Sequence, residues 1–329
     1  MKPTHTNTKH VIGRFAPSPT GPLHFGSLIA ATASYLCAKK NDGKWLLRIE
    51  DIDTQREQKG AAQSIINTLA VYGFEWDGEI TYQSQRSEYY QAALASLDKL
   101  VYPCSCTRKS LMASTGSYSY IYPGLCRDGI ANKQAENHSI RVLTNEEPIC
   151  FSDLCQSNDN NANNKEGHPP TFARSSGNAN EFCQNINKAV GDFILKRSDG
   201  LWAYQLAVVV DDALQGVTEV VRGADLFDNT PRQIYLQKLL GYSQPQYLHF
   251  PVAVDEAGKK LSKQNLSPEI SADQRRATLV SALAFLGQQP PDASEFSSLD
   301  DLWKWAFANW NTENIPKVMS LLCKSGGVS

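Results

Sequence analysis

Short apolar runs alternate with longer amphipathic stretches along the first eighty or so residues. VIGRF (residues 11–15) and KWLLRIEDID (44–53) predict strands, and the second carries charge at its carboxyl end. SLIAATASYLCAKK (27–40) and QKGAAQSIINTLAVYGF (58–74) space their apolar residues as helices do. A strand-helix repeat of this kind predicts a doubly wound α/β domain over a parallel sheet, whose ligands bind outside the carboxyl ends of the strands.

This alternation stops near the middle of the chain. Residues 156–181 are rich in Asn, Ser and Gly and predict a disordered surface loop. Residues 192–223 predict further strands around a turn at SDG, with Asp211 and Asp212 at the end of an apolar strand, and the chain from about residue 266 predicts helices.

The chain has 329 residues, which favours one principal domain with an insertion or an appendage. We expect an α/β domain over 1–265, an insertion within it over about 101–190, and a helical unit over 266–329. Its 41% hydrophobic and 20% charged residues exclude a wholly disordered or coiled-coil chain. The net charge of -2 does not point to nucleic acid, although a local basic surface could still bind a phosphate backbone.

The polar start MKPTHTNTKH lacks the apolar segment of a signal peptide, and no later stretch approaches the roughly 18 apolar residues of a spanning helix. We therefore expect a cytoplasmic protein with no membrane partner. Eight cysteines in that compartment are expected to be free thiols or metal ligands, not a disulfide framework. Those expected to be core or incidental thiols are Cys37, Cys150, Cys155, Cys183 and Cys323.

The stretch PSPTGPLHFGSLIAA (17–31) turns from prolines and glycines into an apolar run. Three prolines stiffen the turn and two glycines let the backbone approach a ligand closely: Pro17, Pro19, Pro22, Gly21 and Gly26. His24 is expected to face the same crevice, and the following helix offers free N–H groups to an anion. Alone, the stretch could equally be a turn before a core helix. KKLSKQN (259–265), which clusters three lysines, favours a phosphate site.

PSPTGPLHFGS resembles the HIGH element and KLSK resembles the KMSK element of class I aminoacyl-tRNA synthetases, and GRFAPSPTG with RIEDID narrows the resemblance to the glutamyl branch. Five segments are most similar to the short paralogues of glutamyl-tRNA synthetase: HFGS, CSC, WAYQLAVVVDD, QGVTEVVRGADL and KLSKQN. The resemblance covers about residues 11–265 outside the Asn-rich stretch. It implies a Rossmann-like catalytic domain with a zinc-bearing insertion, a C-terminal helical stem-contact-like unit and no anticodon-binding domain.

The resemblance also implies a reaction. L-Glutamate is activated by ATP, with its Mg²⁺, to glutamyl-adenylate without tRNA, and is then transferred to the queuosine base in the anticodon loop of tRNA(Asp). We expect a monomer whose partners are ATP, L-glutamate and the tRNA(Asp) anticodon arm. Two alternatives stay open: a truncated glutamyl-tRNA synthetase that charges an acceptor end, and a catalytically inactive RNA-binding paralogue.

Activation of an amino acid requires cations and N–H donors around the phosphates of ATP. By resemblance, His24 and Lys263 are catalytic and, with Gly26, bind ATP. Lys260 matches the first lysine of KMSK and is the third catalytic candidate. Lys259 has no matching role and is expected to be solvated.

A glutamate pocket requires cations for two carboxylates and an anion for the ammonium group. Arg14 and Arg222 can each bind a carboxylate with two N–H groups, and Glu50 suits the ammonium. Which arginine takes the side-chain carboxylate stays open. Asp51 and Asp53 could face a ligand or pair with a neighbouring arginine, and Asp211 and Asp212 could be structural or face the nucleotide. By resemblance, the glutamate site is lined by Arg14, Ala16, Ser18, Glu50, Tyr204 and Arg222.

Cys104 and Cys106 form a C-x-C, and Cys126 follows about twenty residues later, a pattern moderately specific for zinc. Zinc usually takes four ligands. The short paralogues have a tyrosine four residues before the last cysteine, which implies Tyr122. The residues themselves also leave open Tyr118, Tyr120 and His138. Such a zinc would hold the fold of the insertion and take no part in catalysis.

Overall fold

The computed structural model describes most of the chain. Its described residues are 10–40, 42–115, 121–132, 137–157, 172–174, 178–261 and 269–323. Lys263, Tyr118, Tyr120 and most of the Asn-rich stretch lie outside them. Within the described residues, no helix is both long enough and apolar enough to span a bilayer.

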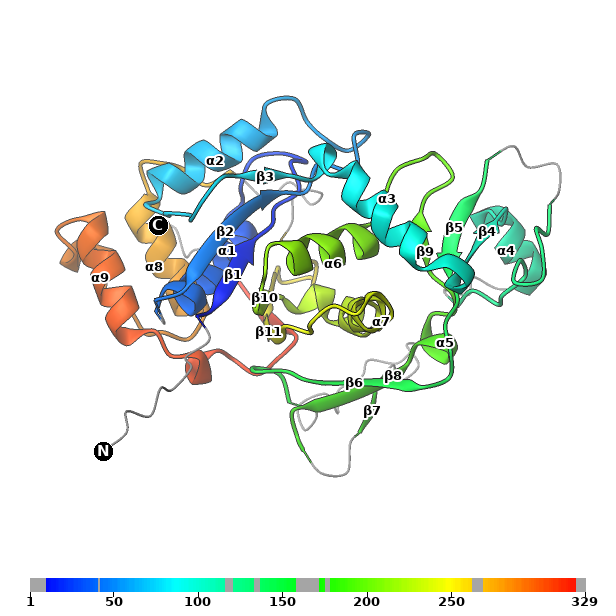
Figure 1. Ribbon diagram of the computed structural model, residues 1–329. Coiled ribbons are helices and arrows are strands. Elements are labelled where there is room, and N and C mark those ends of the chain that lie inside the picture. The colour runs from blue at the N-terminus through cyan, green and yellow to red at the C-terminus, as the bar shows by residue number, and fades with distance from the viewer. Residues whose placement is uncertain are drawn as a thin grey trace, which may run out of the picture.

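The centre of the molecule is a parallel sheet in two hydrogen-bonded parts (Figure 1). Its strands are β1 (Ile12–Phe15), β2 (Lys44–Ile49), β3 (Thr81–Tyr82), β10 (Glu219–Gly223) and β11 (Gln246–Phe250). The Thr218 amide donates to the carbonyl of Ile12 at 2.9 Å, so β10 continues the sheet beside β1. The spatial order β3-β2-β1-β10-β11 reverses direction between β1 and β10, the position where ligands of such sheets bind.

Helices cover both faces of this sheet. On one face lie α1 (Phe25–Lys39), α2 (Ala61–Val71), α8 (Arg275–Phe285) and α9 (Leu299–Asn309); on the other lie α3 (Ser87–Ser96), α6 (Tyr204–Leu214) and α7 (Thr230–Leu240). Neighbouring strand residues divide between the two cores, because successive side chains of a strand point to opposite faces. Val221 and Leu248 belong to the core with α1, and Val220 and Tyr247 to the core with α6.

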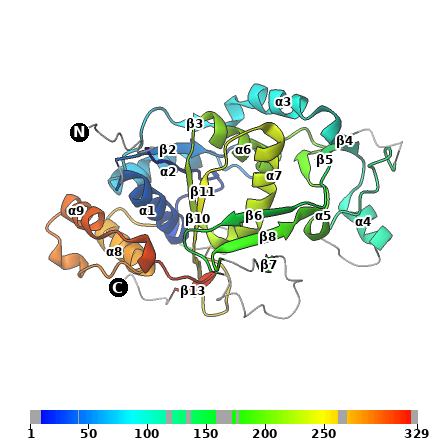
Figure 2. The same ribbon diagram turned by 60° about the horizontal axis from the view of Figure 1, so that its bottom comes forward.

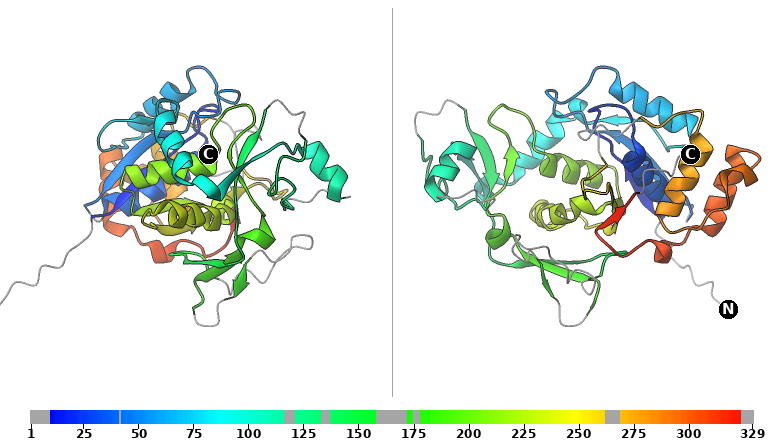
Figure 3. Two further views of the ribbon diagram at one scale, coloured as in Figure 1. Left: turned by 45° about the vertical axis from the view of Figure 1, so that its right-hand side comes forward. Right: turned by 180° about the vertical axis from the view of Figure 1, so that it is seen from behind.

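An insertion between α3 and α6 forms the end of the molecule opposite α9 (Figure 1 and Figure 3). One antiparallel sheet contains β4 (Val101–Cys104), β5 (Ser139–Val142) and β9 (Ile194–Lys196), with α4 (Arg108–Thr115) following β4; a second contains β6 (Pro148–Ser152), β7 (Ala173–Arg174) and β8 (Glu181–Asn185), with α5 (Ile186–Ala189) following β8.

The expectation that Cys150 and Cys183 are incidental thiols is wrong. The two residues are register partners in β6 and β8 and form a disulfide bond. Antiparallel pairing brings their Cα atoms to 4.1 Å although 33 positions separate them in sequence. The sequence offered no signal for this pairing, because it depends on the register in which β6 and β8 pair.

The expectation of a strand ending at Asp211 and Asp212 is also wrong. Residues Tyr204–Leu214 form helix α6, and every side chain from Gln205 to Asp212 is buried. A short apolar segment that is buried on all sides has no polar positions. Its sequence therefore lacks the alternation of apolar and polar residues that distinguishes a helix from a strand. Both carboxylates consequently lie within a buried helix, close to the sheet.

The C-terminal part contains a strand as well as helices. Residues Ser320–Leu322 form β13 (Figure 2), which pairs in parallel with β12 (Val252–Val254). Helix α8 packs against α1, and both belong to one apolar core. The division at residue 265 therefore stays a prediction.

Candidate active site

A cavity of about 540 Å³ opens at the carboxyl ends of β1, β10 and β11, where the strand order reverses. The segments after β1 and β2, the start of α1 and the start of α6 also line it. It brings together every described residue predicted for the ATP and glutamate sites: Arg14, Ala16, Ser18, His24, Gly26, Glu50, Tyr204, Arg222 and Lys260. Their individual roles stay predictions.

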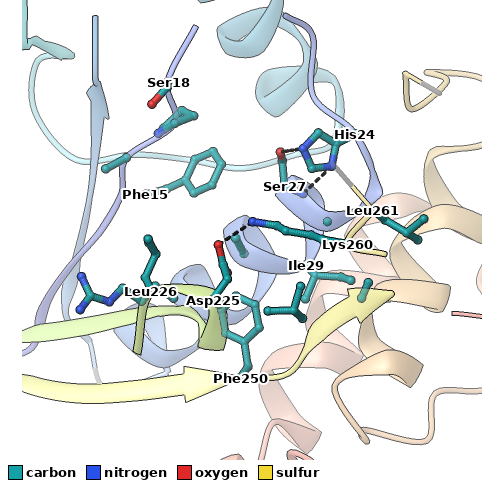
Figure 4. Close-up of a pocket in the computed structure, with 18 of the residues that line it drawn as sticks. Phe15, Ser18, His24, Ser27, Ile29, Asp225, Leu226, Phe250, Lys260 and Leu261 are labelled. Carbon is teal, nitrogen blue, oxygen red and sulfur yellow. Dashed lines mark hydrogen bonds and ion pairs between the residues drawn. The ribbon is translucent and has the colours of Figure 1, made fainter. Parts of the chain in front are cut away.

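His24 is the N-cap of α1 and lies at the cavity wall (Figure 4). Its Nδ1 accepts the backbone N–H of Ser27 at 3.3 Å, and its Nε2 lies 3.0 Å from Ser27 Oγ. Because Nδ1 accepts, the ring proton of the neutral imidazole belongs on Nε2, which donates to the hydroxyl. The ring thus lies beside the N–H groups of the first helical turn, which favour an anion.

Gly26 lets the backbone at Leu261 and the ring of His24 lie close to the start of α1. A Cβ there would lie 3.0 Å from the carbonyl oxygen of Leu261 and 3.1 Å from the His24 ring. The lysine cluster therefore contacts the start of α1 through Leu261. Gly21, with φ of 143°, adopts a conformation that favours glycine.

Lys260 extends along the cavity and ends at Asp225. Its Nζ lies 2.5 Å from Asp225 Oδ2, an ion pair visible in Figure 4. The amide of Leu261 donates to the carbonyl of Ala253 at 2.8 Å, and Lys260 bridges back to Val254. The beginning of the KLSK segment is thus attached to β12 at the edge of the cavity.

Arg14 does not face the cavity as a free cation. Its Nε and Nη2 donate to the two carboxylate oxygens of Asp212 at 3.1 and 3.3 Å. Arg48 Nη2 lies 2.8 Å from the same carboxylate and 3.6 Å from Glu50. Burial opposes ionisation of Asp212, but the charges of Arg14 and Arg48 outweigh it and hold the pKa of Asp212 below its usual range.

Glu50 is the carboxylate of this cluster that lines the cavity. Burial raises its pKa to about 7, although the charges of Arg48 and Arg14 act in the opposite direction. Tyr204 stands close by, and burial raises the pKa of its hydroxyl. A carboxyl group that titrates near neutrality beside an open cavity can respond to a cationic ligand.

Arg222 differs from Arg14 in its partners. Its Nε donates to His249 Nε2 at 3.0 Å, its Nη1 to Gln233 Oε1 at 2.8 Å and its Nη2 to Thr230 Oγ1 at 2.8 Å. Among the described residues, no carboxylate lies within ion-pair distance of it. Arg222 is 5% exposed and lines the cavity, so a buried guanidinium with neutral partners faces the ligand space.

The acidic residues after β2 serve the scaffold. Asp53 pairs with Arg56 at 2.7 Å and with Arg197 at 3.1 Å. Asp51 accepts the amide and the hydroxyl of Ser84. Neither aspartate lines the cavity, which favours the structural interpretation of both.

A cysteine cluster lies in the insertion. The sulfur atoms of Cys104, Cys106 and Cys126 all lie within 4.8 Å of one another, an arrangement that could hold a metal ion. Tyr122 Oη lies 3.3 Å from Cys104 Sγ and 3.8 Å from Cys106 Sγ. His138 is described but does not belong to the cluster.

Arg141 is a neighbour of this cluster that the sequence did not reveal. Its Nε donates to Cys104 Sγ at 3.2 Å, and its guanidinium lies 3.8 Å from the centre of the Tyr122 ring. One cation thus contacts both a cysteine sulfur and the tyrosine ring of the cluster.

Residues 10–320 match the family described as tRNA synthetases class I (E and Q), catalytic domain. The chain belongs to this family.

Two relatives within the family match nearly the whole chain. The chain is 47% identical over 312 residues to a protein of Ectopseudomonas mendocina named glutamyl-Q tRNA(Asp) synthetase, covering 94% of this chain and 96% of the relative. It is 46% identical over 318 residues to a protein of the same name from Dechloromonas aromatica, covering 94% and 97%.

A solved structure of the glutamate-tRNA synthetase from Elizabethkingia anophelis superposes with a TM-score of 0.75. The superposition covers 97% of this chain and 69% of that one, at 23% sequence identity. At that identity the likeness concerns the fold, which is that of a class I synthetase.

For this class I family member, sequence reasoning left the role of Asp212 open and missed His249 and Asp225. Asp212 pairs with Arg14, His249 accepts a hydrogen bond from Arg222, and Asp225 pairs with Lys260. A local signal existed for Asp225, because it follows Arg222 closely. His249 gave no signal beyond being a histidine in an apolar strand.

Proposed function

We propose that this chain activates L-glutamate with ATP to glutamyl-adenylate without tRNA, and then transfers the glutamate to the queuosine base in the anticodon loop of tRNA(Asp). The observation that carries the proposal is the cavity, whose lining combines the HIGH-like and KLSK-like segments with Glu50 and Arg222. The names of the relatives, which match this chain over almost their full length, support the acceptor.

In the activation step, an oxygen of the glutamate α-carboxylate attacks the α-phosphorus of ATP, and pyrophosphate leaves. His24, Lys260 and Lys263 would stabilise the charge on the phosphates, and Gly26 would let the nucleotide approach the start of α1. Mg²⁺ would accompany ATP and neutralise part of the phosphate charge.

The partners of the two arginines suggest different roles in binding glutamate. Arg222, whose partners are neutral, would receive a substrate carboxylate with its remaining N–H groups. Arg14, already paired with Asp212, would form the wall beside it. Glu50, with Ala16, Ser18 and Tyr204 near it, would bind the ammonium group.

We infer that the cysteine cluster binds a structural zinc ion through Cys104, Cys106, Tyr122 and Cys126. Three thiols and a phenol oxygen that points between two of them supply a four-ligand set that suits zinc. The ion would hold the insertion together. Residues 1–265 would then form the catalytic domain and residues 266–329 a stem-contact-like helical unit.

The activation step is tested by glutamate-dependent exchange of labelled pyrophosphate into ATP with purified protein and no RNA. Exchange is expected with L-glutamate and not with L-glutamine or L-aspartate. Exchange that begins only when tRNA is added would contradict a tRNA-independent activation.

The acceptor is tested with a stem-loop of the tRNA(Asp) anticodon arm that carries queuosine and a 3′-phosphate, which blocks charging at the terminal ribose. Labelled glutamate should enter this stem-loop in an alkali-labile ester and should not enter the same stem-loop carrying guanosine. If the stem-loop is inert while full-length tRNA(Glu) is charged, the chain is a truncated glutamyl-tRNA synthetase. If neither RNA is labelled and no exchange occurs, the inactive RNA-binding alternative holds.

A further inference from the structure

Behind Arg222, a buried aspartate and a buried histidine from two distant parts of the chain meet. Asp153 follows β6 of the insertion and His249 lies in β11 of the central sheet, which Figure 2 shows running close to one another. Their side chains are both 0% exposed, and Asp153 Oδ2 lies 2.5 Å from His249 Nδ1. The insertion therefore contributes a carboxylate to the back of the amino-acid pocket.

Hydrogen bonding fixes the protonation of this histidine. Nε2 accepts the Nε–H of Arg222, so it carries no proton, and the ring proton is on Nδ1, which donates to Asp153. Burial lowers the pKa of His249, although Asp153 acts in the opposite direction, which agrees with a neutral ring. Arg222 thus donates a hydrogen bond to His249, and His249 donates one to Asp153.

The other oxygen of Asp153 is also occupied. Oδ1 accepts the backbone N–H groups of Cys155 at 2.9 Å, Gln156 at 2.8 Å and His249 at 3.3 Å. An acceptor is thus required at Oδ1 whatever residue stands at this position, which leaves only Oδ2 to face the imidazole.

We propose that Asp153 is a positioning residue for amino-acid binding, which acts through His249 to aim the guanidinium of Arg222 at the substrate carboxylate. The inference rests on the proposed function. The fixed tautomer presents an acceptor to Arg222 Nε, which leaves the opposite edge of the guanidinium for the cavity. The carboxylate also supplies a negative charge two hydrogen bonds from Arg222, so this buried cation is stable in the empty pocket.

The substitution Asp153→Asn separates this role from simple packing. The amide has nearly the shape of the carboxylate, and the three backbone N–H groups retain the amide oxygen at the Oδ1 position. The amide nitrogen then faces His249 Nδ1 and donates to it, which moves the ring proton to Nε2. Two donors, His249 Nε2–H and Arg222 Nε–H, would then point at one another. The nearest acceptor for Nε2–H is Thr230 Oγ1 at 3.2 Å, which already accepts from Arg222 Nη2, so both contacts of the guanidinium on this side are disturbed and it is expected to shift.

Pyrophosphate exchange with the Asp153→Asn variant should show a KM for glutamate raised about tenfold to a hundredfold, because a buried donor has lost its acceptor. The KM for ATP should change less than about twofold. The matched control is Tyr235→Phe, which removes the part-buried hydrogen bond that the Tyr235 hydroxyl of α7 donates to the carbonyl of Leu143 and leaves the partners of Arg222 in place. It should leave both KM values unchanged.

Two further measurements keep the inference testable if the variant is poorly folded or the activity is absent. Long-range proton–nitrogen correlation spectra of histidine-labelled wild type should show His249 protonated at Nδ1, and in Asp153→Asn at Nε2. In the double variant with His249→Gln, the glutamine oxygen can accept from Arg222, so part of the glutamate affinity should return.

An unchanged glutamate KM in a folded Asp153→Asn variant, or equal rises in both KM values, would overturn the inference. A wild type that shows the Nδ1 tautomer but no glutamate-dependent exchange would instead contradict the proposed function. The two failures are thus distinguishable.

Discussion

The substitution Asp212→Asn tests whether the charge cluster behind the pocket determines both the stability of the fold and the pKa of Glu50. In the folded protein three guanidinium groups face three carboxylates across this cluster: Arg14, Arg48 and Arg86, and Glu50, Asp211 and Asp212. The amide removes one negative charge without changing the size of the side chain. Arg48, which is fully buried, then retains a carboxylate only at 3.6 Å.

Loss of one partner of a buried ion pair costs about 3–5 kcal/mol, because it leaves a charge in the interior without compensation. Asp212 bonds two arginines, and its side chain is 8% exposed, so little water can replace it. We expect the free energy of unfolding to fall by about 3–5 kcal/mol. Asp199→Asn is the matched control: its pair with Arg197 has side chains 34% and 39% exposed, and such a pair contributes only about 0–1 kcal/mol.

Urea unfolding of the two variants and the wild type, followed by circular dichroism, measures this difference at constant m-value. The wild type has a total stability of about 5–15 kcal/mol, so the variant should still fold at low temperature. A loss for Asp212→Asn no larger than that for Asp199→Asn would refute the reasoning. A second consequence is a lower pKa for Glu50, because the charge of Asp212 contributes to raising it.

The remaining predictions concern the lysine segment, the metal and pH. Lys263→Ala should reduce glutamate-dependent pyrophosphate exchange by about 2–4 kcal/mol of transition-state stabilisation, and Lys259→Ala should leave it unchanged; equal rates in the two variants would remove Lys263 from the mechanism. Purified protein should contain about one zinc by atomic emission. The double variant Cys104→Ser and Cys126→Ser should lose the zinc, and its insertion should be cleaved more readily in limited proteolysis, while some glutamate activation persists. A fully folded wild type without metal would contradict this prediction. The anionic form of Glu50, whose pKa is about 7, should bind the ammonium group, so the KM for glutamate should fall as pH rises from about 6 to 8; Glu50→Gln should weaken binding and remove that pH dependence, and an unchanged dependence would assign it to another group.

Local patterns predicted the first half of the central sheet well, because each of its elements follows its own period. β1, β2 and α2 lie within the ranges expected from apolar spacing, and α1 begins two residues before its expected range. The parallel sheet and the location of the pocket at its carboxyl edge followed from that alternation. The same reasoning was wrong for α6, where burial on all sides removed the polar positions that reveal a helix.

Interactions that join distant positions could not be predicted from one sequence. Arg14 and Asp212 are 198 positions apart, and Asp153 and His249 are 96 apart. Neither pair belongs to a motif with fixed spacing, and each depends on which elements the fold brings together. The motifs identified the residues that line the cavity, whereas the residues that orient them became visible only with the fold.

The pairing of β12 with β13 makes the C-terminal strand a support for the side of the cavity that contains Lys260. Met319 accepts the amide of Val252, and the Cys323 amide donates to the carbonyl of Val254 at 2.8 Å. The hairpin that begins at Val254 leads directly to Lys260. A proline placed at Leu321, or a bulky fusion joined soon after it, would therefore act on the reaction from a distance, by loosening the anchorage of the lysine segment while leaving every residue of the cavity intact.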